Sequence, residues 1–341
     1  MMSSEYAPQS GSSQHLDKYE LYERLGRGGM AEVWKAFDTQ LHRYVAIKLL
    51  HPDLRDDSNF RARFLREAQL VAQLRHPNIV QIYDFQVSQG RASAAHTNAS
   101  AYMVMEYIEG QTLASYIART SRQRHFPSAQ DILYLFASIS RAVDYAHQRG
   151  MIHRDIKPAN ILLDQRDTTY NSMGEPMLTD FGLVKLLGAS TGSSSGSWLG
   201  TPLYISPEQA QGYPGNEHSD IYALGVTLYE LFTGALPFSG ETPAAILQQH
   251  IHAQPTSPVL LNPAIPPPLA MVILRCLAKD PAARFAGASS LTEALAEALE
   301  LSVPEHMDTA VSPMDPANEP THVGVQLQAS SEQTILSLIH I

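Results

Sequence analysis

The side chains best suited to chemistry lie in one short stretch of the chain, from Met151 to Leu163. Within it, Asp155 and Lys157 are two residues apart, so in an extended backbone they point the same way, and Asn160 follows with an amide oxygen. Apolar residues bracket these polar groups, and because an unpaired buried charge is costly, the charges must find partners in the fold. A carboxylate that can accept a hydroxyl proton, a cation for phosphate and a neutral oxygen ligand for a hard metal together suit phosphoryl transfer.

Two further charged residues stand in apolar surroundings. Lys48 lies in the centre of a predicted strand, Val45–Leu50, and Glu67 interrupts the apolar stripe of a helix predicted over residues 59–74. Each could be a solvated residue at the edge of its element, and a lysine can extend along apolar surface to reach water. However, both residues place a charge in an apolar stretch, and the two charges are opposite. We therefore predict that Lys48 and Glu67 form an ion pair.

A glycine-rich stretch, Gly26 to Ala31, separates two predicted strands, Tyr19–Leu25 and Glu32–Phe37. Glycines let the backbone approach a ligand closely and present N–H groups to phosphate. A dinucleotide-binding loop of similar spacing leads into a helix, whereas here a second strand follows. The pattern therefore predicts a β-hairpin with a glycine-rich turn.

The composition argues against several classes of function. The 341 residues include 24 basic and 34 acidic side chains, a net charge of −10, whereas a nucleic-acid-binding surface would be basic. The 14 histidines lack the spacing of a zinc site, and the one cysteine, Cys276, cannot form an internal disulfide, which favours a reducing compartment. We find no secretory signal and no run of about 18 apolar residues. We therefore expect a cytoplasmic chain with no nucleic-acid partner and no membrane span, although the full-length protein could be anchored in a membrane.

These motifs, taken in order, resemble the protein kinase family, and among its branches the bacterial eukaryotic-like (Hanks-type) serine/threonine kinases. The motifs that carry the resemblance are Leu25–Val33, Val45-Ala-Ile-Lys48, Arg66-Glu-Ala68, His76-Pro-Asn-Ile-Val80, His153-Arg-Asp155, Asp180-Phe-Gly182 and Gly200–Glu208. Lys157, two residues after Asp155, is typical of the serine/threonine kinases. The segment Ser206-Pro-Glu208 departs slightly from the family's commoner Ala-Pro-Glu.

The resemblance covers residues 19–298 and implies an α+β, two-lobed protein-kinase fold. The small lobe, about 19–108, would hold a five-stranded antiparallel sheet and one helix, and the large, mainly helical lobe would span about 111–298. Residues 1–18 are then expected to form a flexible tail. Residues 299–341 are expected to form a linker or disordered tail, which could be truncated before a membrane span.

The resemblance also implies a role for each polar residue. Asp155 would accept the proton of a Ser or Thr hydroxyl, Lys157 would contact the transferred phosphate, and Lys48, held by Glu67, would grip the α- and β-phosphates of ATP. Asn160 and Asp180 would hold Mg²⁺ or Mn²⁺. The residues expected around the nucleotide are Leu25, Gly26, Arg27, Gly28, Gly29, Met30, Ala31, Val33, Ala46, Lys48, Met105, Glu106, Ile108 and Leu162. In the large lobe, Glu208 is expected to pair with Arg284, and Asp220 to bond the backbone of the catalytic loop.

A serine-rich tract, residues 190–201, lies where the family keeps its activation loop. We expect autophosphorylation at one or more of Thr191, Ser193, Ser194, Ser195 and Ser197 to activate the enzyme. Arg154 would bind the added phosphate, and Thr201 would hold the catalytic loop. The resemblance also implies protein substrates and, as in relatives, a possible homodimer through the small lobe.

The predicted function is therefore a serine/threonine protein kinase. A catalytically impaired pseudokinase that binds ATP as a signalling scaffold is the alternative, but such a protein would be expected to lack at least one of Lys48, Asp155, Asn160 and Asp180. A small-molecule phosphotransferase of related fold usually reads His-Gly-Asp in its catalytic loop and lacks the segment around Ser206. A purely structural interaction module would leave the charged residues in apolar settings unexplained.

Overall fold

The computed structural model describes residues 14–28, 31–50, 68–87, 101–122, 126–181 and 201–304. The contacts within the chain divide it into residues 1–307 and 308–341, and every described residue belongs to the first unit.

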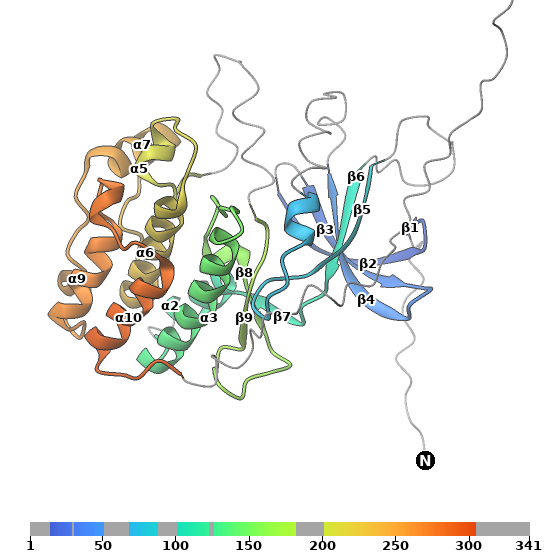
Figure 1. The fold of residues 1–341 in the computed structure, drawn as a ribbon, viewed down its shortest axis with the longest axis horizontal. Helices are drawn as coiled ribbons and strands as arrows, with labels where there is room; N and C mark the ends of the chain where they lie inside the picture. Colours follow the sequence, from blue (N-terminus) through green and yellow to red (C-terminus); the bar gives the residue numbers. More distant parts are fainter. Residues whose placement is uncertain are drawn as a thin grey trace, which may run out of the picture. The chain divides into compact units, whose positions relative to one another are not determined.

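The N-terminal part of this unit is an antiparallel sheet in the order β1-β2-β3-β4-β6-β5 (Figure 1). Its strands are β1 (Gln14–Leu16), β2 (Tyr19–Arg27), β3 (Ala31–Asp38), β4 (Arg43–Leu50), β5 (Ile82–Val87) and β6 (Ala101–Glu106). Strands β2 and β3 form the predicted hairpin around the glycine-rich turn. The helix predicted over residues 59–74 falls largely outside the described residues, and its described part is helical over residues 68–72.

The strand β1 corrects two expectations, because the sheet has six strands among the described residues and residues 14–16 form a strand and not part of a tail. Leu16 is buried in a cluster with Tyr19 and Leu21, so a single apolar residue in a polar segment secures the strand. The turn between β1 and β2 contains Asp17 at a positive φ, and the hydroxyl of Tyr102 on β6 donates a hydrogen bond to its carboxylate. Residues 1–13 lie outside the described residues.

The register of the sheet determines which side chains share a face. Val33 on β3 lies opposite Lys48 on β4, which in turn lies opposite Met103 on β6. Ala46 and Met105 form the neighbouring pair two residues along, and since side chains alternate along a strand they point the same way as Lys48. This face therefore collects the residues predicted to surround a nucleotide. The opposite face packs its own small apolar cluster.

The C-terminal part is mainly helical. Its helices are α2 (Leu113–Arg122), α3 (Ala129–His147), α5 (Pro207–Ala210), α6 (Glu217–Thr233), α7 (Pro243–His252), α8 (Pro258–Leu261), α9 (Pro267–Cys276) and α10 (Ala288–Leu299), with short 3-10 turns η2 (Pro158–Asn160) and η3 (Pro281–Ala283). A second sheet, β7-β8-β9, is formed by Gly110–Thr112, Ile161–Asp164 and Glu175–Leu178. The two-lobed α+β fold is thus confirmed. No helix among the described residues is long and apolar enough to span a membrane.

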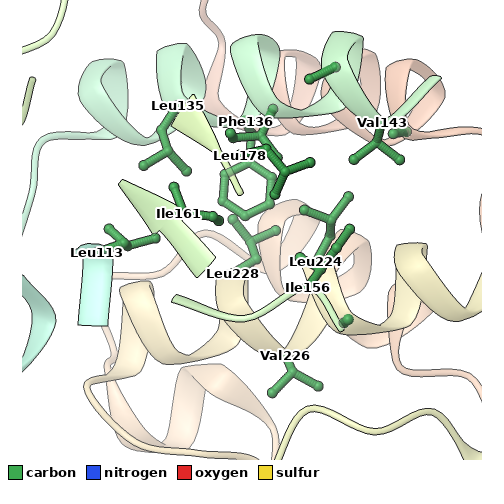
Figure 2. Close-up of a cluster of buried hydrophobic side chains, with 14 of the residues drawn as sticks. Leu113, Leu135, Phe136, Val143, Ile156, Ile161, Leu178, Leu224, Val226 and Leu228 are labelled. Carbon is green, nitrogen blue, oxygen red and sulfur yellow. The ribbon is translucent and has the colours of Figure 1, made fainter. Parts of the chain in front are cut away.

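The buried core of this part holds the catalytic stretch between two helices (Figure 2). Phe136 from α3 and Leu224 from α6 lie on opposite sides, with Ile156, Ile161 and Leu178 between them. All five side chains are essentially inaccessible to solvent. Burial of large aliphatic and aromatic side chains stabilises a fold by about 2 kcal/mol each, so the apolar residues that bracket the polar motif anchor it firmly.

Candidate active site

The catalytic loop is held by one buried carboxylate, that of Asp220 on α6. Its Oδ2 accepts a hydrogen bond from the backbone N–H of His153 at 2.9 Å, and its Oδ1 accepts one from that of Arg154 at 2.8 Å. Arg154 has a φ of +63°, a conformation that costs energy for a residue with a side chain. The two bonds from Asp220 compensate that cost, and they confirm its predicted contact with the loop backbone.

Asp155 lies just after this turn, with two polar partners. Its Oδ2 accepts a hydrogen bond from Nζ of Lys157 at 2.8 Å, and Nδ2 of Asn160 donates to the same oxygen at 3.1 Å and to the backbone carbonyl of Asp155 at 2.8 Å. The side chains of Asp155 and Lys157 remain 32% and 35% exposed. The carboxylate is thus oriented by the chain yet open to an incoming hydroxyl group.

His153 connects the catalytic loop to the segment that carries Asp180. Its Nδ1 accepts from the N–H of Asp155 at 3.3 Å, and its Nε2 donates to the carbonyl of Thr179 at 3.0 Å. Burial lowers the pKa of His153, although the nearby carboxylates of Asp220 and Asp155 act in the opposite direction. The ring is therefore neutral at pH 7, and a neutral imidazole has one donor and one acceptor, as these two bonds require. Phe181 packs against it, with 4.6 Å between ring centroids.

Lys48 reaches from the sheet to Asp180, and its Nζ lies 2.7 Å from Oδ1 of that carboxylate. Partial burial raises the pKa of Asp180, but the charge and hydrogen bond of Lys48 outweigh this and hold the pKa below its usual value. The two residues are 132 positions apart in the chain. Glu67, the predicted partner of Lys48, lies outside the described residues, so their pairing stays a prediction.

The donor set around Asp155 and Asp180 fits a hard divalent cation. Asn160 and Asp180 are neighbours, because the N–H of Thr179 donates to the carbonyl of Asn160 at 3.0 Å. In the assigned orientation of its amide group, Asn160 donates from Nδ2 to Asp155, and its Oδ1 accepts no hydrogen bond from the described residues. Oδ2 of Asp180 likewise accepts none within that part of the chain. Two oxygens of this kind are among the ligands that Mg²⁺ prefers.

The residues predicted around the nucleotide line the same face and edge of the two sheets. The apolar members Ala31, Ala46, Met105 and Ile108 are buried in the main core, and Val33 and Leu162 pack partly buried against it. Leu25, Gly26, Arg27 and Gly28 are exposed on the hairpin, and Glu106 is half-buried, while Gly29 and Met30 lie outside the described residues. A small hollow behind Met105 is also lined by Asp180 and Phe181. The two sheets therefore present an apolar surface beside the charged groups.

The segment after residue 200 is fastened to the large lobe by the predicted pair. Arg284, which is fully buried, donates from both terminal nitrogens to Glu208 at 2.9 Å. Burial raises the pKa of Glu208, but the bonds from Arg284 and Ser219 outweigh this and lower the pKa to about 2. On α5, Nε2 of Gln209 donates to the carbonyl of Arg154 at 3.1 Å. The segment is thus tied directly to the catalytic loop.

The regulatory residues are only partly described. Nε of Arg154 donates to the carbonyl of Gly215 at 3.2 Å. Thr201 is exposed, and among the described residues its side chain makes no hydrogen bond to the catalytic loop. The proposed phosphorylation sites Thr191, Ser193, Ser194, Ser195 and Ser197 lie outside the described residues.

Sequence reasoning missed the contact between Lys48 and Asp180 and the link from His153 to Thr179. A signal for the second existed, because His153 is a titratable residue inside an apolar bracket. No local pattern could have indicated which of several carboxylates Lys48 meets, since this depends on how the sheet packs on the large lobe.

An apolar surface beside a lysine, two aspartates and an asparagine is typical of a phosphotransferase. The model of the protein kinase domain family matches residues 19–298. The chain belongs to this family, in its bacterial serine/threonine (Hanks-type) branch.

Two relatives illustrate the match. Serine/threonine-protein kinase PrkC of Bacillus subtilis is 41% identical over 274 residues, and PknB of Mycolicibacterium smegmatis is 39% identical over 297 residues. The alignments cover 80% and 86% of this chain but 39% and 45% of the relatives, so the chain spans about two fifths of their length. The crystal structure of the PknI kinase domain of Mycobacterium tuberculosis is similar with a TM-score of 0.65 at 27% identity, covering 85% of this chain and 99% of that one.

Proposed function

We propose that this chain is a serine/threonine protein kinase domain that transfers the γ-phosphate of ATP, in the presence of Mg²⁺ or Mn²⁺, to hydroxyl groups of proteins. Its family and its relatives support this activity. Because the chain spans only part of the relatives' length, the activity, substrates and partners of the whole protein are included in the proposal. Residues 19–298 would form the catalytic domain, with lobes that meet near residues 108–111.

One observation carries the proposal, namely the gathering of polar groups from distant parts of the chain. Lys48 comes from β4, Asp180 follows β9, and both lie beside the loop that holds Asp155 and Asn160. A purely structural role does not require this set, because a buried charge pair is seldom more stabilising than apolar packing of the same volume. The set is what phosphate and a divalent cation would require.

Each residue then has a task in the reaction. Asp155 orients the substrate hydroxyl and accepts its proton, and Lys157, already 2.8 Å from that carboxylate, stabilises negative charge as it develops on the transferred group. Lys48 holds phosphate oxygens, and Asn160 with Asp180 holds the metal ion. When bound, the metal ion would neutralise charge on the phosphates.

We also propose the regulatory residues given above. Arg154, whose backbone N–H donates to Asp220, would bind a phosphate added to one or more of Thr191, Ser193, Ser194, Ser195 and Ser197. Cys276 is buried, and burial raises its pKa, so it is poorly suited to redox chemistry, which is consistent with a cytoplasmic setting.

The decisive test replaces Asp155 with Asn, which keeps the shape of the side chain and removes its capacity to accept a proton. We expect phosphotransfer to fall at least about 100-fold, while the Kd for Mg-ATP, measured by calorimetry, stays close to that of the wild type. Asp167→Asn is the matched control, because Asp167 is exposed and its carboxylate accepts a hydrogen bond from the N–H of Thr169 and not from the catalytic loop. Wild-type turnover by Asp155→Asn would refute the assignment. Binding of ATP by an intact wild-type protein that transfers no phosphate would instead favour the scaffold alternative.

A further inference from the structure

Three arginines gather around Tyr145 at the end of α3, and the proposed reaction uses none of them. Arg141 and Tyr145 lie one turn apart on the helix, so their side chains are neighbours on its surface. Arg149 follows the end of the helix and folds back, with its guanidinium carbon 3.7 Å from the ring centroid of Tyr145 and its Nη1 donating to the carbonyl of that residue at 3.4 Å. The N–H of Arg75, in the segment before β5, donates to the hydroxyl of Tyr145 at 3.1 Å. Arg75, Arg141, Tyr145 and Arg149 thus form an arginine cluster.

His76 packs against the arginine cluster without adding charge to it. Its ring lies 5.2 Å from that of Tyr145, measured between the centroids, and the residue is buried. Burial lowers the pKa of His76, and the charges of Arg141 and Arg149 lower it further, to about 4. The imidazole is therefore neutral at pH 7, and the positive charge of this surface belongs to the arginines alone.

The arginine cluster has no counter-charge in the described part of the chain. The ion pairs found there involve none of its three arginines. Asp144, the carboxylate nearest to them along α3, instead accepts two N–H groups at the start of α10, at 2.9 and 2.8 Å. Arg75 and Arg149 are exposed and Arg141 is half-buried, so an anion from solution can reach them. Positive charges that lie together without a partner attract such an anion.

The groups that remain available in the cluster are all hydrogen-bond donors. The side chains of Arg75 and Arg141 make no hydrogen bond with any residue that the structure describes, and the hydroxyl of Tyr145, which accepts from a backbone N–H, has its own hydrogen left to donate. Forked guanidinium groups match the oxygens of phosphate, and a phosphorylated side chain offers three acceptor oxygens and a charge of about −1.5 to −2. The net charge of −10 disfavours extended polyanions such as nucleic acids and acidic membranes, so a compact anion fits best.

We propose that the arginine cluster binds a phosphorylated serine or threonine side chain of a protein. None of its residues bonds Asp155, Lys157 or Asn160, so the site is separate from the catalytic loop. Phosphoserine and phosphothreonine are also the products of the proposed reaction. A protein held at the cluster by one phosphorylated side chain leaves the catalytic loop open to a second hydroxyl group.

The test measures the binding of a fluorescent peptide with one phosphothreonine, and of its unphosphorylated twin, to the whole chain by fluorescence anisotropy. We expect the wild type to bind the phosphorylated peptide at least about tenfold more tightly. The double variant Arg141→Gln/Arg149→Gln should raise the Kd for that peptide at least about tenfold, because each charge-assisted bond contributes about that factor. Arg119→Gln is the matched control and should leave the Kd within about twofold, since Arg119 is also exposed and lies over a tyrosine ring, that of Tyr116, at 5.6 Å.

Melting temperatures show whether the double variant folds. If it does not, Arg141→Gln alone decides, and it should raise the Kd for the phosphorylated peptide about three- to tenfold. Equal Kd values for the two peptides would overturn the inference. So would an unchanged Kd in the variants, which would indicate product bound at the catalytic loop, or binding of phosphatidylserine vesicles with no preference for the phosphorylated peptide. Binding is measured without ATP, so the proposed function fails separately, by a wild-type chain that phosphorylates no peptide.

Discussion

The pair between Glu208 and Arg284 allows a quantitative test of how the segment after residue 200 is secured. In Glu208→Gln the side chain keeps its shape and loses its charge. Arg284 would remain fully buried, bonded to backbone carbonyls of His218 and Ala278 but without a counter-charge. Removing one partner of a buried ion pair typically costs about 3 to 5 kcal/mol.

The pKa of Glu208 supplies an independent magnitude. Its fall from the ordinary value of 4.5 to about 2 corresponds to about 3 kcal/mol of stability at neutral pH. The carboxylate is only 13% exposed, so screening by solvent reduces this little. The two estimates agree, and about 3 kcal/mol is a large share of the roughly 5 to 15 kcal/mol by which domains are stable.

The same pKa predicts how the effect depends on pH. Because the pKa of Glu208 is lower in the folded state than in the unfolded state, its contribution is complete above about pH 4.5 and is lost as the pH falls toward 2. The difference in unfolding free energy between wild type and Glu208→Gln should therefore be about 3 kcal/mol at pH 7 and less than half of that near pH 3.

Urea denaturation at several pH values measures this difference, with Glu293→Gln as the control. Glu293 is exposed on α10, so its substitution removes the same charge without breaking a buried pair. A cost below about 1 kcal/mol relative to this control at pH 7, or a difference that does not shrink toward pH 3, would refute the reasoning.

Two further variants test the large lobe. Asp144 on α3 accepts hydrogen bonds from the N–H groups of Ala288 and Ser289 at the start of α10, at 2.9 and 2.8 Å. Asp144→Ala should therefore cost about 1 to 2 kcal/mol in urea denaturation, and an unchanged midpoint would contradict this. In Asp220→Asn one of the acceptors for the catalytic loop becomes a donor, so we expect kcat to fall about 10- to 100-fold. The affinity for ATP, measured by calorimetry, should change little. Equal losses in kcat and in the affinity for ATP would indicate general unfolding.

Much of the architecture was accessible from local patterns. The hairpin around the glycines, the strand with Lys48 and the buried helix α6 each follow from periodicity or turn chemistry within a few residues. The pairing of Glu208 with Arg284 and the bonds from Asp220 to the catalytic loop were predicted because the resemblance to a family carries long-range contacts with it. Physical reasoning about single segments would not have found them.

The misses occur where a local signal was weak. Strand β1 was taken for part of a tail, because its polar residues resemble a linker and only Leu16 reaches the core. The neutral state of His153 depends on burial, which no local pattern reports.

The order and types of the residues by themselves determined many of the elements of this protein, its family and which side chains are candidates for the reaction, because helix and strand periods, glycine turns and motifs act over short distances. Only the tertiary structure decided that Lys48 meets Asp180 across 132 residues of chain. Such contacts depend on how whole elements pack, and packing sums many weak interactions that no short stretch of chain contains.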